Sequence, residues 1–245
     1  MRYFIDISYR GAPFHGWQVQ PGATTVQSVI EEALSRLTRQ PVGIVGAGRT
    51  DAGVNARQMI AHCDLPDSIA VDSSFERSLN AMCGRDISIN SIRTVAGDAH
   101  ARFDATERTY RYFAHTVKDP FAGELSWQAP PSLDFEAMNR AADLILGRRD
   151  FTSFSKLHTD VKTNICDLRR AQWHRIDASH FYFEISADRF LRNMVRAVVG
   201  TLVEVGRHKM SPEAIIDVIN AADRCAAGTS MPAGPLFLWE VKYPF

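Results

Sequence analysis

Apolar side chains recur at every second position over residues 3–9, and polar side chains stand between several of them. Because successive side chains of a strand point to opposite faces, this period predicts a strand with one buried face. Residues 26–37 instead space their apolar side chains three and four positions apart, which predicts a helix that stops at Pro41. Thr24 and Gln27 have the spacing of a capping box at the start of that helix.

The pattern continues through the rest of the first half of the chain. Apolar, β-prone runs at residues 42–45 and 59–63 predict strands on either side of a glycine-rich loop. A helical pattern over residues 73–82 and a strand pattern over residues 86–95 follow. The resulting order, β-α-β-β-α-β, is that of ferredoxin-like and RRM-like units.

The second half repeats this order weakly, with little sequence identity to the first. Its predicted elements are strand 109–115, helix 134–146, strands 163–176 and 180–187, helix 190–205, a short helix from residue 211, and strand 236–243. We therefore expect an α+β fold of two ferredoxin/RRM-like halves, residues 1–105 and 106–245. Their mainly antiparallel sheets would join into one continuous sheet, with helices on one face and the other face open to a ligand.

The loop at residues 46–56, with the sequence GAGRTDAGVNA, holds the most conspicuous candidate chemistry. Its three glycines within eight residues indicate tight turns or close approach by another group. Arg49 and Asp51 lie on this loop between two predicted strands, which is a common way to hold a catalytic carboxylate over a rigid sheet. A glycine-rich turn whose Asp binds local amides is the alternative. The loop lacks the spacing of a phosphate-binding motif.

Two further segments carry candidate functional side chains. Arg196 is flanked by apolar residues in the predicted helix 190–205, so we expect it to enter the protein and find a partner there. Arg192 stands four residues earlier, on the same predicted helix flank, where it would be solvated or contact an RNA phosphate. Tyr110 and Tyr112 would share one face of a strand, and packing is the default role for both.

Net charge does not indicate the kind of partner. The chain has 28 basic and 28 acidic residues, so any basic surface must come from the arrangement of charges or from two subunits placed side by side. Of the basic residues 23 are Arg and 5 are Lys. This preference suits bidentate contacts with RNA phosphates, although a GC-rich genome would produce it as well.

Cysteine usage and the apolar runs bear on the cellular compartment. The four cysteines are far apart, which argues against a zinc site or a disulfide framework and for a reducing compartment. Asp6 lies within the first apolar run, so that run does not read as a signal peptide. Arg196 interrupts the longest apolar stretch before it reaches membrane-spanning length. We expect a cytoplasmic protein.

Seven short segments, in order along the chain, resemble those of the TruA-type tRNA pseudouridine synthases. They are GWQVQ at residues 16–20, GRTDAGV at 48–54, HARFDAT at 100–106, RTYRY at 108–112, DFTSF at 150–154, LRNMVR at 191–196 and GPLFL at 234–238. The resemblance implies an isomerase that converts uridine to pseudouridine in the anticodon stem-loop of tRNA, at positions 38, 39 and 40. It also implies an RNA-binding cleft between the halves, a homodimer, and neither a metal nor an organic cofactor.

The same resemblance assigns roles to individual residues. Asp51 would be the catalytic nucleophile, and Arg196, the last residue of LRNMVR, would pair with it. Tyr110, the first tyrosine of RTYRY, would stack on the target uracil, which replaces stacking lost when a nucleotide leaves its helix. Arg49 is expected to take part in base flipping or to contact the RNA.

Three positions depart from the family pattern, and two other classes of function stay open. Asn55 stands where the family usually has His, and Asn193 and Ala197 differ from the common H-M-V-R-N form. A non-catalytic RRM-like RNA-binding protein is one alternative, although its usual aromatic signature is absent. A small-molecule hydrolase with Asp51 as general base is the other, disfavoured because no second acid or His is its neighbour.

Overall fold

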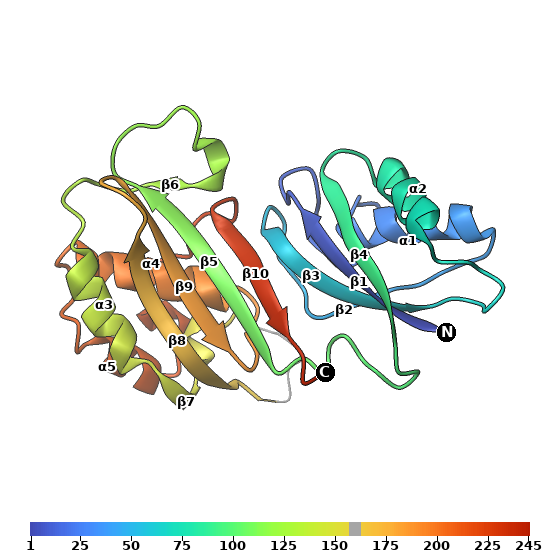
Figure 1. Ribbon diagram of the computed structural model, residues 1–245. Coiled ribbons are helices and arrows are strands. Elements are labelled where there is room, and N and C mark those ends of the chain that lie inside the picture. Colours follow the sequence, from blue (N-terminus) through green and yellow to red (C-terminus); the bar gives the residue numbers. More distant parts are fainter. Residues whose placement is uncertain (157–162) are drawn as a thin grey trace. The chain divides into compact units, whose positions relative to one another are not determined.

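The computed structural model describes residues 1–156 and 163–245, and within them the chain forms two compact units. The first unit comprises residues 1–106 and 237–245, and the second comprises residues 107–236. Each has helices and a mainly antiparallel sheet, so the expected α+β class is confirmed (Figure 1). None of the described helices has the length and apolar character needed to cross a membrane.

The first unit has the predicted β-α-β-β-α-β order. Its elements are β1 (Arg2–Tyr9), α1 (Val26–Thr38), β2 (Val45–Gly46), β3 (Asn55–Asp64), α2 (Ser73–Cys83) and β4 (Ile87–Val95). β1 lies between β4 and β3 and is antiparallel to both, and β2 pairs with β3. The last strand, β10 (Leu236–Lys242), runs parallel to β3 through the pairs Phe237–Asn55 and Leu238–Ala56. Most of this strand therefore belongs to the first unit.

The two faces of the first sheet differ in polarity, as the period of two in β1 predicts. Tyr3, Ile5 and Ile7 are all less than 5% exposed and belong to the core. Helices α1 and α2 contact each other on one face of the sheet (Figure 1). The alternate position Asp6 instead accepts hydrogen bonds from Gln58 at 2.8 Å and Asn90 at 2.9 Å. Polar side chains thus cover part of the face away from the helices.

The capping box of α1 lies one residue later than the sequence pattern predicts. Thr25 is the N-cap: its hydroxyl accepts from the Ser28 amide at 3.1 Å, and its own amide donates to the Ser28 hydroxyl at 3.0 Å. Gln27 serves another purpose, because its side chain donates to the carbonyl of Ile44 at 3.1 Å. The prediction of Thr24 and Gln27 was wrong because the Gln27 amide has a partner elsewhere in the fold.

The second unit contains the remaining elements. They are β5 (Glu107–His115), β6 (Trp127–Gln128), α3 (Phe135–Leu144), β7 (Gly147–Asp150), β8 (Ile165–Arg175), β9 (His180–Ala187), α4 (Met194–Gly206) and α5 (Ile215–Asn220), with 3-10 turns at Gly123–Leu125, Thr152–Phe154 and Arg224–Ala226. The strand order is β5-β9-β8-β7, antiparallel throughout, and the short β6 runs parallel to β5.

Helix α4 is the centre of the second unit. Eleven of its thirteen residues are buried, so the helix is enclosed almost all round. A Cβ added at Gly200 would lie 1.8 Å from the carbonyl oxygen of Thr229. Only glycine therefore allows the segment of residues 228–231 to lie directly against this helix.

Helix α4 begins later than the apolar spacing predicts. Asn193 has a φ of 66°, in the left-handed region, and the helix starts at the next residue, Met194. A left-handed residue interrupts a right-handed helix, which is why the predicted start at Phe190 was wrong. Arg192 consequently lies in the preceding loop, where its carbonyl accepts from the Lys156 amide at 3.0 Å. It does not share a helix flank with Arg196.

Candidate active site

The Asp51 loop, residues 46–54, begins at the last residue of β2, leads into β3, and is tied to its surroundings by hydrogen bonds. The Ala47 amide donates to the carbonyl of Ile60 at 2.7 Å. The carbonyl of Thr50 accepts from the Trp17 amide at 3.2 Å, and the Thr50 hydroxyl is 2.8 Å from that of Tyr9. These bonds fix the residue directly before Asp51 from its backbone and its side chain.

Glycines let the Asp51 loop approach its neighbours closely. A Cβ at Gly46 would lie 2.6 Å from the indole of Trp17, which is 2% exposed, as expected for a core residue. Gly16 has a φ of 86°, and a Cβ there would lie 2.7 Å from the Thr50 carbonyl oxygen. Gly53, with a φ of 79°, forms the turn in which the Val54 amide donates to the Asp51 carbonyl at 3.1 Å. Close contact explains Gly46 and a positive φ explains Gly53, whereas an added Cβ at Gly48 would meet no atom within 4 Å.

The charged residues of this loop differ in exposure. Arg49 is exposed, and its Nε donates to the side chain of Gln18 at 3.1 Å. Asp51 is half-buried on the turn. Asn55, which departs from the family pattern, is 1% exposed and accepts from the Gly11 amide at 2.8 Å. Asn55 therefore contributes to holding the loop.

Tyr110 lies on β5 in the second unit. Tyr110 and Tyr112 pair with Ile185 and Phe183 of β9, two positions apart, so the two tyrosines share one sheet face as predicted. The Tyr110 ring is half-buried and meets the ring of Phe190 edge to face, with 5.1 Å between centroids and 85° between planes. This contact sets the orientation of the Tyr110 ring.

Arg196 is held in the first turn of α4. Its Nε donates to the carbonyl of Met231 at 2.5 Å, and the Met231 amide donates to the Arg196 carbonyl at 3.1 Å. The segment around Met231 is itself tied to the helix: the Gly228 amide donates to the Thr201 hydroxyl at 2.9 Å, and Asn193 donates to the Ser230 hydroxyl at 2.6 Å. The expectation that Arg196 finds an internal partner is confirmed, and that partner is a backbone carbonyl.

The hydroxyl of Tyr112 is an exception to the general rule that buried polar groups are hydrogen-bonded. Tyr112 is 0% exposed, and among the described residues its hydroxyl has no hydrogen-bond partner. Leaving such a group unpaired costs about 1–3 kcal/mol. Burial raises the pKa of Tyr112, and the positive charge of Arg196 acts in the opposite direction.

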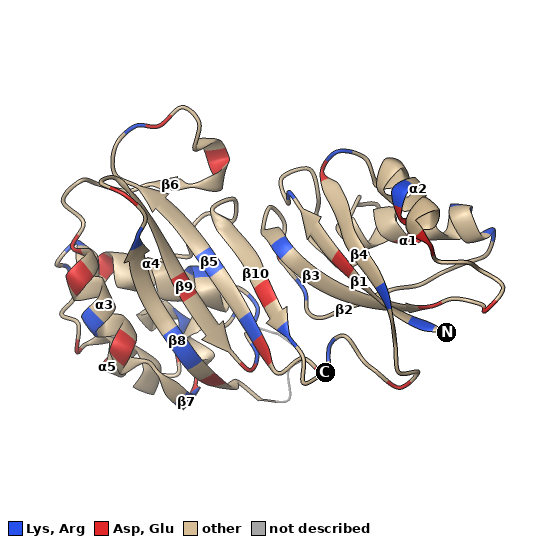
Figure 2. Ribbon diagram, viewed as in Figure 1, with Lys and Arg blue, Asp and Glu red and all other residues tan. Residues whose placement is uncertain are grey.

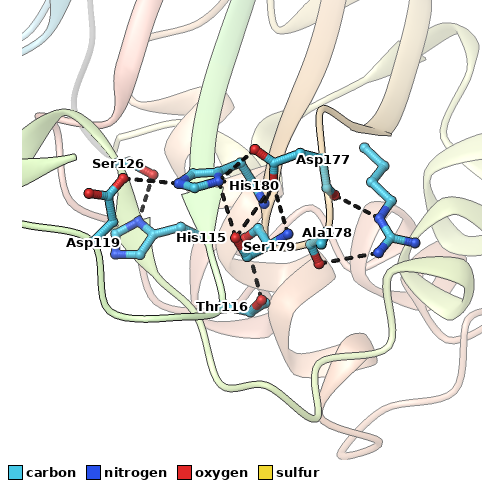
Figure 3. Close-up of polar contacts among 9 residues, drawn as sticks. His115, Thr116, Asp119, Ser126, Asp177, Ala178, Ser179 and His180 are labelled. Atoms are coloured by element: carbon cyan, nitrogen blue, oxygen red, sulfur yellow. Dashed lines mark hydrogen bonds and ion pairs between the residues drawn. The ribbon is translucent and has the colours of Figure 1, made fainter. Parts of the chain in front are cut away.

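A second polar cluster lies toward the end of β5 where His115 is found (Figure 3). His180 stands between two carboxylates: its Nδ1 is 3.0 Å from Asp177, and its Nε2 is 3.1 Å from Asp119. Both hydrogen bonds raise the pKa of His180, that to Asp177 more strongly. The cluster joins the turn after β8 to the segment after β5. Across residues 1–156 and 163–245, no three His, Cys, Asp or Glu side chains form a potential metal site.

Charged residues of both signs alternate across β5, β9 and β8 (Figure 2). Glu184 is 9% exposed in its side chain and forms ion pairs with Arg111 at 2.8 Å and Arg170 at 2.9 Å. Arg169 contacts Glu107 at 3.1 Å. Three arginines of this sheet, Arg111, Arg169 and Arg170, therefore form ion pairs with carboxylates of the same chain.

The predicted site residues thus divide between the two units. Asp51 and Arg49 lie on one loop of the first unit, and Tyr110 and Arg196 lie in the second. The pairing of Asp51 with Arg196 stays a prediction. Sequence reasoning missed the anchoring carbonyl of Met231, for which no signal exists because every residue has a carbonyl.

Comparison with known proteins gives consistent matches over the whole chain. A family model described as tRNA pseudouridine synthase matches residues 141–244. Proteins named tRNA pseudouridine synthase A from Parabacteroides distasonis and Porphyromonas gingivalis are 54% and 52% identical to this chain, each over 99% of it and over 96% and 97% of their own lengths.

Among solved structures, an H/ACA RNP bound to a substrate RNA containing 2'-deoxyuridine matches 82% of this chain and 44% of its own chain, at 9% identity and a TM-score of 0.38. That likeness is too weak to bear on fold or function. The matches to full-length relatives are decisive, because identity above one half extends from end to end. The chain belongs to the tRNA pseudouridine synthase A family.

Proposed function

We propose that this protein isomerises uridine to pseudouridine at positions 38, 39 and 40 of the tRNA anticodon stem-loop. The observation that carries the proposal is the Asp51 loop, in which the residue before the carboxylate is fixed through its backbone and its hydroxyl. A nucleophile must be aimed before it can attack, and a loop held by glycine contacts over a sheet provides that aim.

The reaction requires the target nucleotide to leave its stacked position, so that the base can be reached. The Asp51 carboxylate attacks C1′ of the ribose, and the bond between C1′ and N1 of the uracil breaks. The detached uracil turns and forms a new bond from C5 to C1′, which releases the carboxylate. The proton on C5 is then lost to a base and N1 of the uracil takes up a proton, so the product is an isomer of the substrate.

Tyr110 and Arg49 are assigned to handling of the base and the RNA. The ring of Tyr110, oriented by its edge-to-face contact with Phe190, stacks on the flipped uracil. Arg49 is exposed on the same loop as Asp51, where its guanidinium can contact the flipped nucleotide or the RNA beside it. Arg196 is assigned as the partner of Asp51, and its anchoring by Met231 keeps the guanidinium in place while the carboxylate changes charge.

Binding of a polyanion by a chain without net charge calls for an arrangement beyond one subunit. We propose a homodimer in the cytoplasm, in which arginines of both subunits line the tRNA path. The internal ion pairs of Arg111, Arg169 and Arg170 support this, because they leave less free positive charge on one subunit. A monomer with full activity in sedimentation experiments at micromolar concentration would contradict the dimer.

Release of tritium from tRNA labelled at C5 of uridine tests the nucleophile. Asp51→Asn keeps the size of the side chain but removes the attacking charge, so release should vanish while tRNA affinity stays within about twofold, because phosphate contacts elsewhere dominate affinity. Asp98→Asn is the matched control, since Asp98 is an exposed acid of the same unit outside the loop.

The outcomes separate the alternative functions. Tritium release by Asp51→Asn near the wild-type rate would remove Asp51 as nucleophile. Wild-type protein that binds tRNA without releasing tritium would be a non-catalytic RNA-binding protein, and wild-type protein that does neither would favour a hydrolase of small molecules.

A further inference from the structure

The turn at residues 100–104, which belongs to the HARFDAT segment, has no role in the reaction proposed above. Its most conspicuous residue is Phe103, which is 75% exposed to solvent. Burial of a phenylalanine ring is strongly favourable, and the fold gains little of that free energy here. Single exposed apolar side chains are common on protein surfaces, so the surroundings of Phe103 decide whether it indicates a function.

Hydrogen bonds within the turn fix its backbone. The His100 amide donates to the Asp104 carboxylate at 2.7 Å, and the Asp104 amide donates to the His100 carbonyl at 3.1 Å. The amides of Arg102 and Phe103 both donate to Nδ1 of His100, at 3.1 and 3.2 Å. The backbone that carries Phe103 is therefore held by the turn itself.

The turn is also anchored to the body of the first unit. Ala101 is 0% exposed: its amide donates to Nδ1 of the buried His62 at 3.1 Å, and its carbonyl accepts from the Tyr243 hydroxyl at 2.5 Å. These bonds join the turn to β3 and to the segment that follows β10. A ring presented on a turn held in this way loses little conformational entropy when a partner binds to it.

Two side chains of the turn contact the exposed ring. The His100 ring lies 4.2 Å from the Phe103 ring between centroids, and it meets the buried His62 ring edge to face at 4.6 Å. The guanidinium carbon of Arg102 lies 5.8 Å from the centroid of the Phe103 ring. An aromatic ring beside an arginine is the combination on which unstacked RNA bases pack, with the positive charge available to a phosphate.

We propose that this turn is a second contact with tRNA, in which an unstacked base of the RNA stacks on the Phe103 ring and Arg102 binds the adjoining phosphate. The inference rests on the proposed function, since it takes tRNA as the substrate. The base concerned is other than the target uracil, which is assigned to Tyr110. The nearest acid in the sequence, Asp104, is engaged by the His100 amide within the turn.

Phe103→Leu tests the stacking, because it keeps an apolar side chain and removes the ring. We expect the Kd for a tRNA transcript to rise about tenfold, or about 1.4 kcal/mol, with an unchanged melting temperature because the side chain is exposed. Phe103→Tyr keeps the ring and should bind as the wild type does. Phe121→Leu is the matched control: Phe121 is 96% exposed in the second unit, and its loss should leave Kd within about twofold.

Two further variants test the stacking and the phosphate contact separately. A base that stacks on an indole quenches its fluorescence, so tRNA should quench the emission of Phe103→Trp beyond the quenching seen with the wild type. Phe121→Trp should show no such additional quenching. Arg102→Gln should lower the slope of log Kd against log salt concentration by about 0.7, the value for one lost contact with a phosphate of single-stranded nucleic acid.

The outcomes that would overturn the proposal are distinct from those that bear on catalysis. A wild-type Kd in Phe103→Leu, or an equal loss in Phe121→Leu, would overturn it. A smaller assembly of Phe103→Leu in sedimentation would do so too, because the turn would then contact a second copy of this chain. Tritium release tests the proposed function separately: wild-type protein that binds tRNA without release refutes that function, and the ratio of dissociation constants still decides the role of Phe103.

Discussion

The loop that carries Asp51 and the helix that carries Arg196 are both fixed in place, but by different means. The loop has little regular structure, and two glycines allow the contacts that hold it: Gly46 lets the Trp17 indole approach the loop, and Gly16 lies against the carbonyl of Thr50. Helix α4 is buried on almost every side, and one glycine, Gly200, admits the segment that anchors Arg196. An irregular loop and a buried helix can thus both be held in place by close backbone contacts that glycines permit.

The largest expected effect is on the helix side of this comparison. Gly200→Ala places a Cβ 1.8 Å from the Thr229 carbonyl oxygen, and backbone on both sides leaves no flexible group to move. We expect a loss of about 3 kcal/mol in the free energy of unfolding, at the upper end for overpacking, together with loss of tritium release as the Met231 anchor shifts. Urea unfolding and the tritium assay measure the two effects.

Gly97→Ala is the control for that substitution, since an added Cβ at Gly97 meets no atom within 4 Å. It should change the free energy of unfolding by less than about 0.5 kcal/mol. A Gly200→Ala variant as stable as the control would show that the segment at residues 228–231 is not held as tightly as its contacts indicate.

A smaller effect is expected on the loop side. Gly46→Ala directs a Cβ to 2.6 Å from the Trp17 indole, a side chain that can shift slightly, so the loss should be about 1–2 kcal/mol. Activity should fall further than this loss of stability explains, because the displaced loop carries Asp51. Gly48→Ala, in the same loop with no atom within 4 Å of its Cβ, should be close to wild type in both measurements. Equal behaviour of the two variants would contradict the steric account.

The smallest effect is on the pH dependence of stability. One histidine in each unit contributes to it, and the two contributions have opposite signs. In the first unit, His62 is buried and its Nδ1 accepts from the Ala101 amide at 3.1 Å. Burial lowers the pKa of His62, as do the positive charges of His100 and Arg2, while Asp64 and Asp104 oppose them. Below about pH 6.5 the unfolded chain therefore binds more protons at His62 than the folded chain does. The contribution of His62 to the free energy of unfolding is complete above that pH and is lost as pH falls below it.

In the second unit, His180 shows the reverse. Asp177 and Asp119 raise the pKa of His180, so its contribution is complete below about pH 6.5 and is lost as pH rises through the pKa of the folded state. Urea unfolding at pH 5.5, 6.5 and 7.5 measures both effects. His62→Gln should lose less stability than wild type between pH 6.5 and 5.5, and His180→Gln should lose less than wild type between pH 6.5 and 7.5. The same pH profile in both variants would contradict this assignment.

Local patterns in the sequence were sufficient to predict most of the elements and their order, although they missed the short strands β6 and β7. The period of two in β1 and β5 assigned Tyr3, Ile5, Tyr110 and Tyr112 to the correct faces, because that period follows from strand geometry alone. The glycine spacing at residues 46–53 located the loop that carries Asp51, because steric demands on a turn are local. Motifs along the chain also indicated the family before any geometry was considered.

Contacts between distant residues determined the rest. Asn193 adopts a left-handed conformation, so α4 starts later than the sequence predicts. Gln27 donates to the carbonyl of Ile44 and does not take part in the capping box. The closing strand joined β3 of the first unit, about 180 residues away, as the bond of 3.0 Å from the Val241 amide to Gln58 also shows. Backbone groups that anchor Arg196, and the unpaired hydroxyl of Tyr112, have no signature in a sequence, because every residue offers a carbonyl and only packing decides which polar atom is buried without a partner.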